Sequence, residues 1–357
     1  MNFFYHLLIM KNLKAQFKLI IFFLIFLNVF NFLSAKNKDK FSNSEDLFNY
    51  FSGIVAIQDN QYQTSYSYLK SLDNLEDSHY SYSKYYLYSL ITLKKFKVAA
   101  NYSKNLERKK IDNFESNLVN GIYHLENKNI SQAKIYFEKL KKLSPPDTIQ
   151  SLLSLSLNSW SNLKDIDAAG SNLKSFPRNF ENMKKIQEAF VYCYFDSEKA
   201  DKKFEKLTSD PDVNYSRYHF FHSNYLISQG KEKKAKNILK SSTLLYPTNL
   251  ILNQLQTDLK QKQKNSNKFN CKNINHVIAE ILYVVSNGLS SQGNYTASNF
   301  YLNLAKYLNP NFLSFETLYA ENLELTEQYQ EAIKIYKKIE KIGSNYYWHA
   351  SKRIAFI

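Results

Sequence analysis

The sequence predicts an all-α protein built as a solenoid of antiparallel helix pairs, and three observations carry this prediction. Apolar residues recur at three- and four-residue spacing along most of the chain, as they do in amphipathic helices. The same classes of residue return every 34 positions, which is typical of repeat proteins. Only 7 Gly and 6 Pro occur among 357 residues, too few for the many turns of a β-sandwich or barrel.

The repeat is visible in columns of residues that share a position within successive units. One column holds only small side chains and begins with Ser65, Ala99 and Ala133. Two other columns hold bulky apolar side chains: one begins with Leu72, Leu106 and Leu140, and the other with Tyr62, Phe96 and Ile130. Each unit begins with a helical pattern such as 47–57, continues through a polar turn such as 59–61, and ends with a second amphipathic helix. Two helices of this length cannot bury their apolar faces alone, so we expect the pairs to stack in a row.

This pattern resembles the tetratricopeptide repeat (TPR) family, whose unit favours small residues at positions 8 and 20, a bulky residue at 24 and Pro at 32. Residues 114–147 match best, with Gly121, Ala133, Phe137 and Pro145. The resemblance implies about eight units that wind into a right-handed superhelix, with the first helix of each unit lining a concave groove. The expected units are 46–79, 80–113, 114–147, 150–180, 181–214, 216–249, 279–312 and 313–346.

The first 35 residues predict a signal peptide or an N-terminal anchor. An apolar run at 19–33 follows Lys11, Lys14 and Lys18 and precedes Ser34-Ala35, in the order typical of a secretory signal. We expect cleavage near Ala35 and export to the periplasm or envelope, as in exported bacterial TPR proteins. Three lysines follow the expected cleavage point and disfavour translocation, so a retained segment that contacts the membrane through 19–33 stays open as an alternative.

The rest of the chain divides into two arrays and a connector. Residues 41–260 contain six units and a half unit, and residues 276–357 contain two units and a first helix. Between them, 261–275 is a Lys- and Asn-rich polar loop that we expect to be mobile. The chain ends on an apolar helix, 346–357, where an array normally ends on a polar one. We therefore expect either a piece of a longer array or a last helix that docks on something.

No pattern of residues indicates catalysis, so we expect no enzyme activity, no cofactor and no metal site. His219 and His222 fall on packing positions of a predicted helix, which favours a core role over metal binding. A disulfide between Cys193 and Cys271 would be allowed after export, but an extended array would hold them far apart, so we expect none. The net charge is +15, yet only four residues are Arg, which disfavours nucleic acid as a partner. Small molecules are disfavoured too.

The predicted function is that of a non-catalytic scaffold that binds a peptide or protein segment in its groove, in assembly or maintenance of the cell envelope. The groove positions are apolar in the first three units and polar to acidic further on, and an exposed apolar stripe often marks a partner site. The expected partner-binding residues are Tyr50, Ile54, Lys84, Tyr88, Leu118 and Ile122. In units six and eight the corresponding stripe reads Arg217, Phe220, Asn224, Ile227 and Ser314, Thr317, Glu321, Glu324.

Three alternatives stay open. The apolar stripe could be covered by residues 36–45 or by the superhelix itself, in which case it is core. The protein could be a glycan-handling or enzyme-associated module of the envelope, with Tyr50, Tyr85 and Tyr88 stacking on sugars. If the N-terminal segment is retained, the protein could instead be a membrane-tethered structural array.

Overall fold

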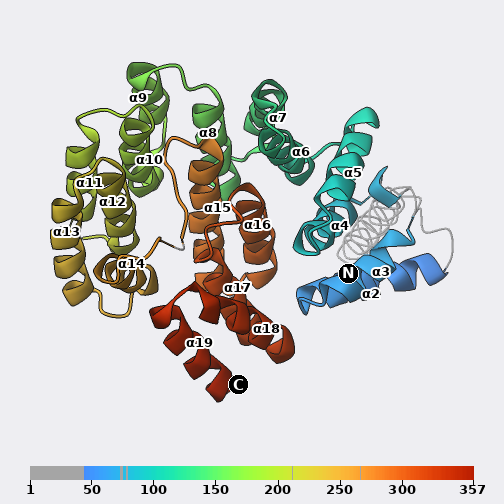
Figure 1. The fold of residues 1–357 in the computed structure, drawn as a ribbon. Coiled ribbons are helices and arrows are strands. Elements are labelled where there is room, and N and C mark those ends of the chain that lie inside the picture. The colour runs from blue at the N-terminus through green and yellow to red at the C-terminus, as the bar shows by residue number, and fades with distance from the viewer. Residues whose placement is uncertain (1–43, 73–74, 78, 211, 266) are drawn as a thin grey trace, which may run out of the picture. The chain divides into compact units, whose positions relative to one another are not determined.

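A computed structural model describes residues 44–357, except for 73–74, 78, 211 and 266 (Figure 1). All regular structure in the described residues is helical, with no strand. None of the described helices is both long and apolar enough to cross a membrane. The predicted signal or anchor at 1–35, with its apolar run at 19–33, lies outside the described residues.

The helices form the predicted pairs, each joined by a short turn. Six pairs come first: α2 (Ser44–Gln58) and α3 (Tyr62–Lys70), α4 (Tyr80–Thr92) and α5 (Phe96–Arg108), α6 (Phe114–Glu126) and α7 (Ile130–Leu143), α8 (Ile149–Ser161) and α9 (Ile166–Lys174), α10 (Glu181–Tyr194) and α11 (Ala200–Thr208), α12 (Ser216–Ser228) and α13 (Glu232–Leu245). The unpaired α14 (Leu250–Lys260) follows. Two further pairs and a last helix complete the chain: α15 (Ile274–Ser291) and α16 (Tyr295–Leu308), α17 (Phe315–Leu325) and α18 (Tyr329–Ile339), α19 (Ser344–Phe356).

Local sequence explains where these helices begin and turn. Asn113 caps α6 by accepting from the Ser116 amide while the Ser116 hydroxyl accepts from the Asn113 amide. Seven of the intra-pair turns contain one residue in the left-handed conformation, which ends the first helix and reverses the chain. These residues keep the 34-residue step within each run: Asn60, Lys94, Lys128; Asp196, Gly230; and Gly293, Glu327.

The column of small residues confirms the expected register of the helix pairs. All eight members have no solvent-exposed surface: Ser65, Ala99, Ala133, Ala169, Ala200, Ala235, Ser298 and Ala332. Gly121, at the other small position, approaches its partner helix so closely that an added Cβ would lie 2.3 Å from the Phe137 ring. The two helices of this unit therefore meet at small side chains, and the structure is an all-α, solenoid-like array.

The array does not stay extended, because its later helices fold back on its earlier ones. Helix α16 packs on α4 and α6, and α15 packs on α8 (Figure 1). The Phe300 ring of α16 stacks on Tyr88 of α4 with 4.3 Å between ring centroids. Near the start of α16, the Thr296 hydroxyl donates to the Ile57 carbonyl oxygen at 3.2 Å. Contacts between distant units therefore add to those between neighbours.

The connector 261–275 is not the mobile polar loop that its composition predicts. The described part of it is pinned to the turn between α16 and α17: the Lys268 amide donates to the Asn311 carbonyl at 3.1 Å, and the Ser314 amide donates to Asn267 Oδ1 at 2.8 Å. Phe269 is buried, with its ring centroid 4.4 Å from that of Phe221 on α12. The expectation is wrong because one aromatic residue and the amide groups find partners within the fold.

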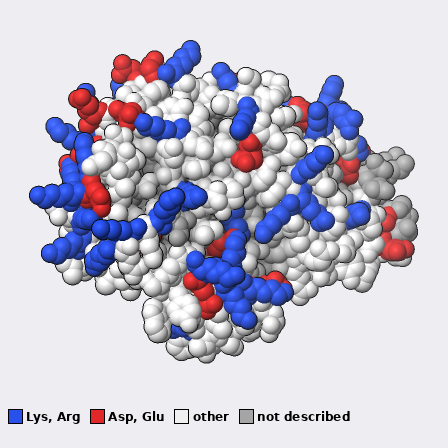
Figure 2. All heavy atoms as spheres, in the orientation of Figure 1, with Lys and Arg blue, Asp and Glu red and all other residues white. Residues whose placement is uncertain are grey.

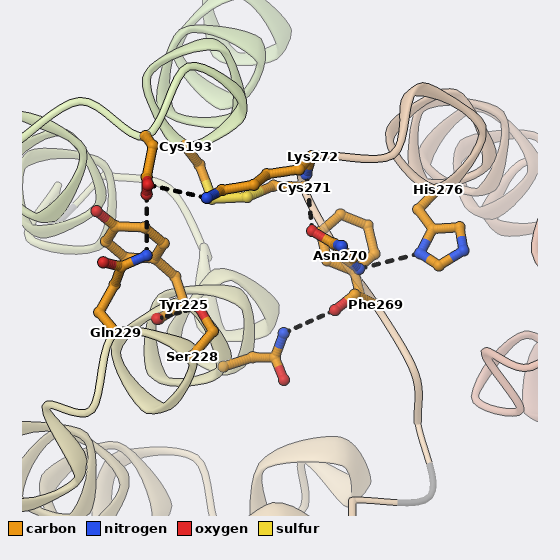
Figure 3. The surroundings of a disulfide bond; sticks show 11 residues. Cys193, Tyr225, Ser228, Gln229, Phe269, Asn270, Cys271, Lys272 and His276 are labelled. Atoms are coloured by element: carbon orange, nitrogen blue, oxygen red, sulfur yellow. Dashed lines mark hydrogen bonds and ion pairs between the residues drawn. A yellow bond between two sulfur atoms is a disulfide. The ribbon is translucent and has the colours of Figure 1, made fainter.

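A disulfide joins Cys193 on α10 to Cys271 in the connector, with 5.9 Å between the Cα atoms (Figure 3). The expectation that the two cysteines stay apart is wrong, because it assumed an extended array. Interactions on both sides of the bridge hold the connector against α10 and α12. The Lys272 ammonium pairs with Asp196 at 2.9 Å, and the Asn224 amide donates to the Phe269 carbonyl at 2.9 Å (Figure 3).

The last helix docks within the chain. Helix α19 packs on α18 and on α14, the helix without a partner of its own. Gln254 of α14 receives a hydrogen bond from the Asn345 amide at 3.0 Å, and it leaves no room for a Cβ at Gly343. Helix α19 therefore covers the open side of α14.

Candidate ligand-binding cavity

Three of the six residues expected to face an open groove are core residues. Tyr88, Leu118 and Ile122 are at most 3% exposed, since α16 lies across the helices that carry them. The expectation of an accessible stripe is wrong at these positions. The structure instead matches the alternative in which the superhelix covers its own apolar stripe.

The other three expected residues do not form one open patch. Tyr50, Ile54 and Lys84 are each half-buried. The Tyr50 ring contacts His79, with 5.5 Å between centroids. The Lys84 ammonium lies 5.6 Å from the centroid of the buried Tyr88 ring. Tyr50 of α2 therefore contacts the residue that precedes α4, and Lys84 lies near a ring of its own helix.

An open cavity exists elsewhere, between the helices of units five and six and those that follow the connector. Its volume is about 600 Å³, and we call it the polar cavity. One side is formed by α10 and the beginnings of α12 and α14, and the other by α15, α17 and α19. Its lining residues are Asn182, Ile186, Val213 to Tyr218, Thr248 to Ile251, Tyr283, Val284, Asn287, Ser314, Thr317, Leu318, Glu321 and Tyr346.

Arg217, which lines the polar cavity, belongs to a buried ion pair. Arg217 of α12 donates to both carboxylate oxygens of Glu280 on α15, at 2.7 and 2.9 Å. Its guanidinium carbon also lies 3.9 Å from the centroid of the Tyr283 ring. Desolvation opposes the charge of Arg217, but the Glu280 carboxylate outweighs it and raises the pKa of the guanidinium. The pair fixes α12 against α15 and leaves little net charge there.

Three residues that line the polar cavity carry a buried hydroxyl oxygen with no hydrogen-bond partner among the described residues: Tyr215 Oη, Tyr218 Oη and Thr317 Oγ1. A buried hydroxyl without a partner costs about 1–3 kcal/mol, so such groups normally meet water or a ligand. Burial raises the pKa of Tyr218 well above its ordinary value, so its hydroxyl stays protonated and can donate. Asn287 of α15 is exposed and adds an amide.

The rim on α17 is acidic. Desolvation by surrounding side chains raises the pKa of the Glu321 carboxyl to about 7, although Arg353 acts in the opposite direction. Arg353 itself is bound to Glu324, donating from Nε at 2.9 Å. With Arg217 matched by Glu280, the polar cavity carries no excess of positive charge. It therefore favours neutral or positively charged ligand groups over anions.

The two histidines considered as metal ligands are packing residues. His222 is buried, with Nε2 2.7 Å from Asp201 Oδ1, and it stacks on Phe204. His219 is half-buried and contacts the ring of Tyr246. Across the described residues, no group of three or more His, Cys, Asp or Glu side chains is arranged to hold a metal ion.

The groove positions predicted from the sequence include only some of the residues that line the polar cavity. Arg217, Ser314, Thr317 and Glu321 were placed on groove positions of units six and eight, and all four line it. The groove positions predicted from the sequence do not include α15, which belongs to unit seven. Glu280, Tyr283 and Asn287 recur at three- and four-residue spacing in an otherwise apolar helix, and this spacing is a usable signal.

Comparison with known proteins adds no family, since neither the scan against protein-family models nor the search of curated proteins finds a match.

Proposed function

We propose that this protein is a non-catalytic, TPR-like scaffold that binds a peptide or protein segment in the polar cavity. The observation that carries the proposal is the set of buried hydroxyls of Tyr215, Tyr218 and Thr317, which have no hydrogen-bond partner among the described residues and belong to side chains that line this space. A peptide backbone presents alternating donors and acceptors that such groups can satisfy. A segment seated there would contact helices from units five to eight at once.

The chemistry of the lining favours a peptide over a glycan. Sugars need a free aromatic face, and the faces of Tyr283 are occupied by the Arg217 guanidinium and by Phe315, whose ring centroid is 5.2 Å away. Tyr88, one of the tyrosines expected to stack on sugars, is covered by Phe300. The acidic Glu321 and the matched Arg217 further favour a segment with neutral or basic side chains.

The disulfide supports a location outside the cytoplasm, since such bonds persist in oxidising compartments. We therefore propose export to the periplasm or envelope and a role in envelope assembly or maintenance. Mass spectrometry of the mature N-terminus tests the first step: we expect cleavage near Ala35, and an intact N-terminus in the membrane fraction would support the tethered array instead.

The binding function is tested by selecting peptides from a random displayed library on the purified, oxidised protein. Selected peptides are then measured by fluorescence anisotropy against the variant Tyr218→Phe with Thr317→Val. Each substitution keeps the shape and removes one hydroxyl. Since a hydrogen bond contributes about 0.5–1.5 kcal/mol, the affinity should fall about tenfold.

The matched control is Tyr225→Phe, which removes a hydroxyl from the same helix outside the polar cavity. It should leave peptide affinity unchanged. Equal binding to all three proteins would place the peptide site elsewhere. Failure to select any peptide, together with binding of soluble saccharides, would favour the glycan-handling alternative.

A further inference from the structure

A second cavity lies where the early and late helices meet. Its volume is about 360 Å³, and we call it the seam pocket. The turn between α4 and α5 contributes Lys94 and Phe96, and the other residues come from the end of α6 and from α16, α17, α18 and the turn between α16 and α17: Glu126, Asn303, Lys306, Tyr307, Asn309, Pro310, Phe312, Leu313, Glu316 and Lys338. It shares no residue with the polar cavity.

Three lysines and two glutamates line the seam pocket, and two of the lysines share one carboxylate. The Lys306 ammonium lies 2.6 Å from one oxygen of Glu316, and Lys338 binds the other oxygen. Lys94 is exposed, and no carboxylate of the described residues lies within ion-pair distance of it. Glu126 is engaged by the Asn275 amide at 2.8 Å. The lysines therefore outnumber the carboxylates, and two of them reach solvent.

The electrostatics of Lys306 agree with a site short of negative charge. Desolvation lowers its pKa to about 8 against the pull of Glu316, and the charges of Lys94 and Lys338 act in the same direction as desolvation. An anion between these lysines would relieve their mutual repulsion. Figure 2 shows Lys and Arg side chains gathered, with acidic ones among them, over the surface that α17 and α18 form.

The rest of the seam pocket is apolar and aromatic. Phe96 and Tyr307 stack with 3.9 Å between ring centroids, and Pro310, Phe312 and Leu313 line the same space. One polar atom here has no partner, since Asn309 Oδ1 is buried without a hydrogen bond. A mostly apolar pocket of this volume with a few convergent polar groups is typical of small-molecule sites.

We propose that the seam pocket binds a small aromatic monoanion, with its carboxylate at Lys94 and Lys338 and its ring against Phe96 and Tyr307. This goes beyond the binding of a peptide segment, and it differs from the expectation that small molecules are disfavoured as ligands. Because the pocket joins the α4–α5 turn to α16, α17 and α18, the bound anion ties the early units to the late ones.

The test uses 2-naphthoate as the probe, with isothermal titration and thermal unfolding of the oxidised protein. We expect saturable 1:1 binding, a rise in the unfolding temperature, and at least tenfold weaker binding of neutral 2-naphthamide. Octanoate at the same concentrations should bind more weakly, because the pocket walls are aromatic. Inorganic phosphate alone should not raise the unfolding temperature.

Two lysine variants locate the site. Lys94→Gln and Lys338→Gln should each weaken 2-naphthoate binding at least fivefold. The control Lys334→Gln lies on the same helix, α18, with a side chain that is 67% exposed and outside the pocket, and it should bind as the parent does. Equal binding of naphthoate and naphthamide, tighter binding of octanoate, or no effect of either pocket variant would overturn the proposal. These outcomes leave the peptide proposal untouched, since the two cavities are separate.

Discussion

The groove-facing positions differ in burial between the two halves of this array. In the first three units, Tyr88, Leu118 and Ile122 lie under α16 and are core residues. In units six and eight, positions such as Arg217 and Thr317 line an open cavity, although Phe220 of the same stripe is fully buried against Phe312. Both sets occupy similar positions within their units, so unit position alone does not decide exposure. What decides it is whether a distant helix returns to cover the stripe.

The polarity of the side chains in each half agrees with their burial. Burying an apolar or aromatic side chain contributes about 1.5–3 kcal/mol, so an apolar stripe gains from a covering helix. A stripe of hydroxyl, amide and charged groups gains nothing from such a cover, because each group would need a partner. The apolar stripe therefore marks an intramolecular contact here, and the polar stripe marks the open space.

The largest expected effect comes from removing the contact between α16 and α4. Phe300→Ala deletes a fully buried ring that stacks on Tyr88, and such a change costs about 3–5 kcal/mol. Urea unfolding followed by circular dichroism measures it. By contrast, Tyr218→Phe in the polar cavity should change stability by less than about 1 kcal/mol. Similar losses in both variants would mean that the two halves of the stripe do not differ.

Breaking the disulfide should come next. The double variant Cys193→Ser with Cys271→Ser releases the connector from α10 and removes a cross-link that spans 78 residues. A loss of roughly 2–4 kcal/mol is expected from such a cross-link, and calorimetry measures it. Dithiothreitol should lower the unfolding free energy of the parent protein by the same amount and leave that of the variant unchanged. A reductant that leaves the parent's unfolding temperature unaffected would show that the bridge does not stabilise the fold-back.

A local packing change should cost less and should test the repeat itself. Ala133→Leu adds three carbons where α6 and α7 meet at a fully buried position, and overpacking of this kind costs about 1–3 kcal/mol. The exposed neighbour Gln132 provides the control, since Gln132→Leu meets only solvent. Thermal unfolding compares the two variants. Equal unfolding temperatures would argue against the close approach of the two helices.

The smallest effect concerns Glu321 and depends on pH; it is small because the side chain is 40% exposed and solvent screens its charge. Its carboxyl has a pKa of about 7 in the folded protein against an ordinary value of 4.5, so the folded state holds the proton more tightly than the unfolded state does. The stability linked to this proton is present below pH 4.5 and is lost as the pH rises to about 7. Glu321→Gln should therefore gain stability relative to the parent across this range. Exposed Glu138→Gln is the control, and parallel pH profiles for parent and Glu321→Gln would contradict the assigned shift.

Much of the fold could be predicted from local pattern. The small-residue column at Ser65, Ala99 and Ala133 placed the helix pairs correctly, because close helix packing demands small side chains wherever the pair recurs. A periodic pattern reflects contacts within a unit and between neighbouring units, and these contacts recur along the structure.

The fold-back could not be predicted in the same way. It depends on the accumulated angles of several units and on an irregular connector, and neither has a periodic signal. Phe269 in a Lys- and Asn-rich segment reads as an isolated residue, yet it fills a space between α12 and the α16–α17 turn. The pairing of Cys193 with Cys271, the burial of Tyr88 and the position of the polar cavity all follow from this one long-range arrangement.

The return of α16 also sets the order in which this chain can complete its fold. In an array with neighbour contacts alone, each unit can fold as soon as it is made. Here α16, at 295–308, packs on helices at 80–126 that are synthesised roughly 170 residues earlier. This distance corresponds to a delay on the order of 10–30 s at common translation rates. During that interval Tyr88 lacks the Phe300 ring that stacks on it, and contacts such as Thr296 to Ile57, 239 residues apart, cannot yet form. Deleting the late units would therefore leave α4 without the Phe300 ring that stacks on Tyr88.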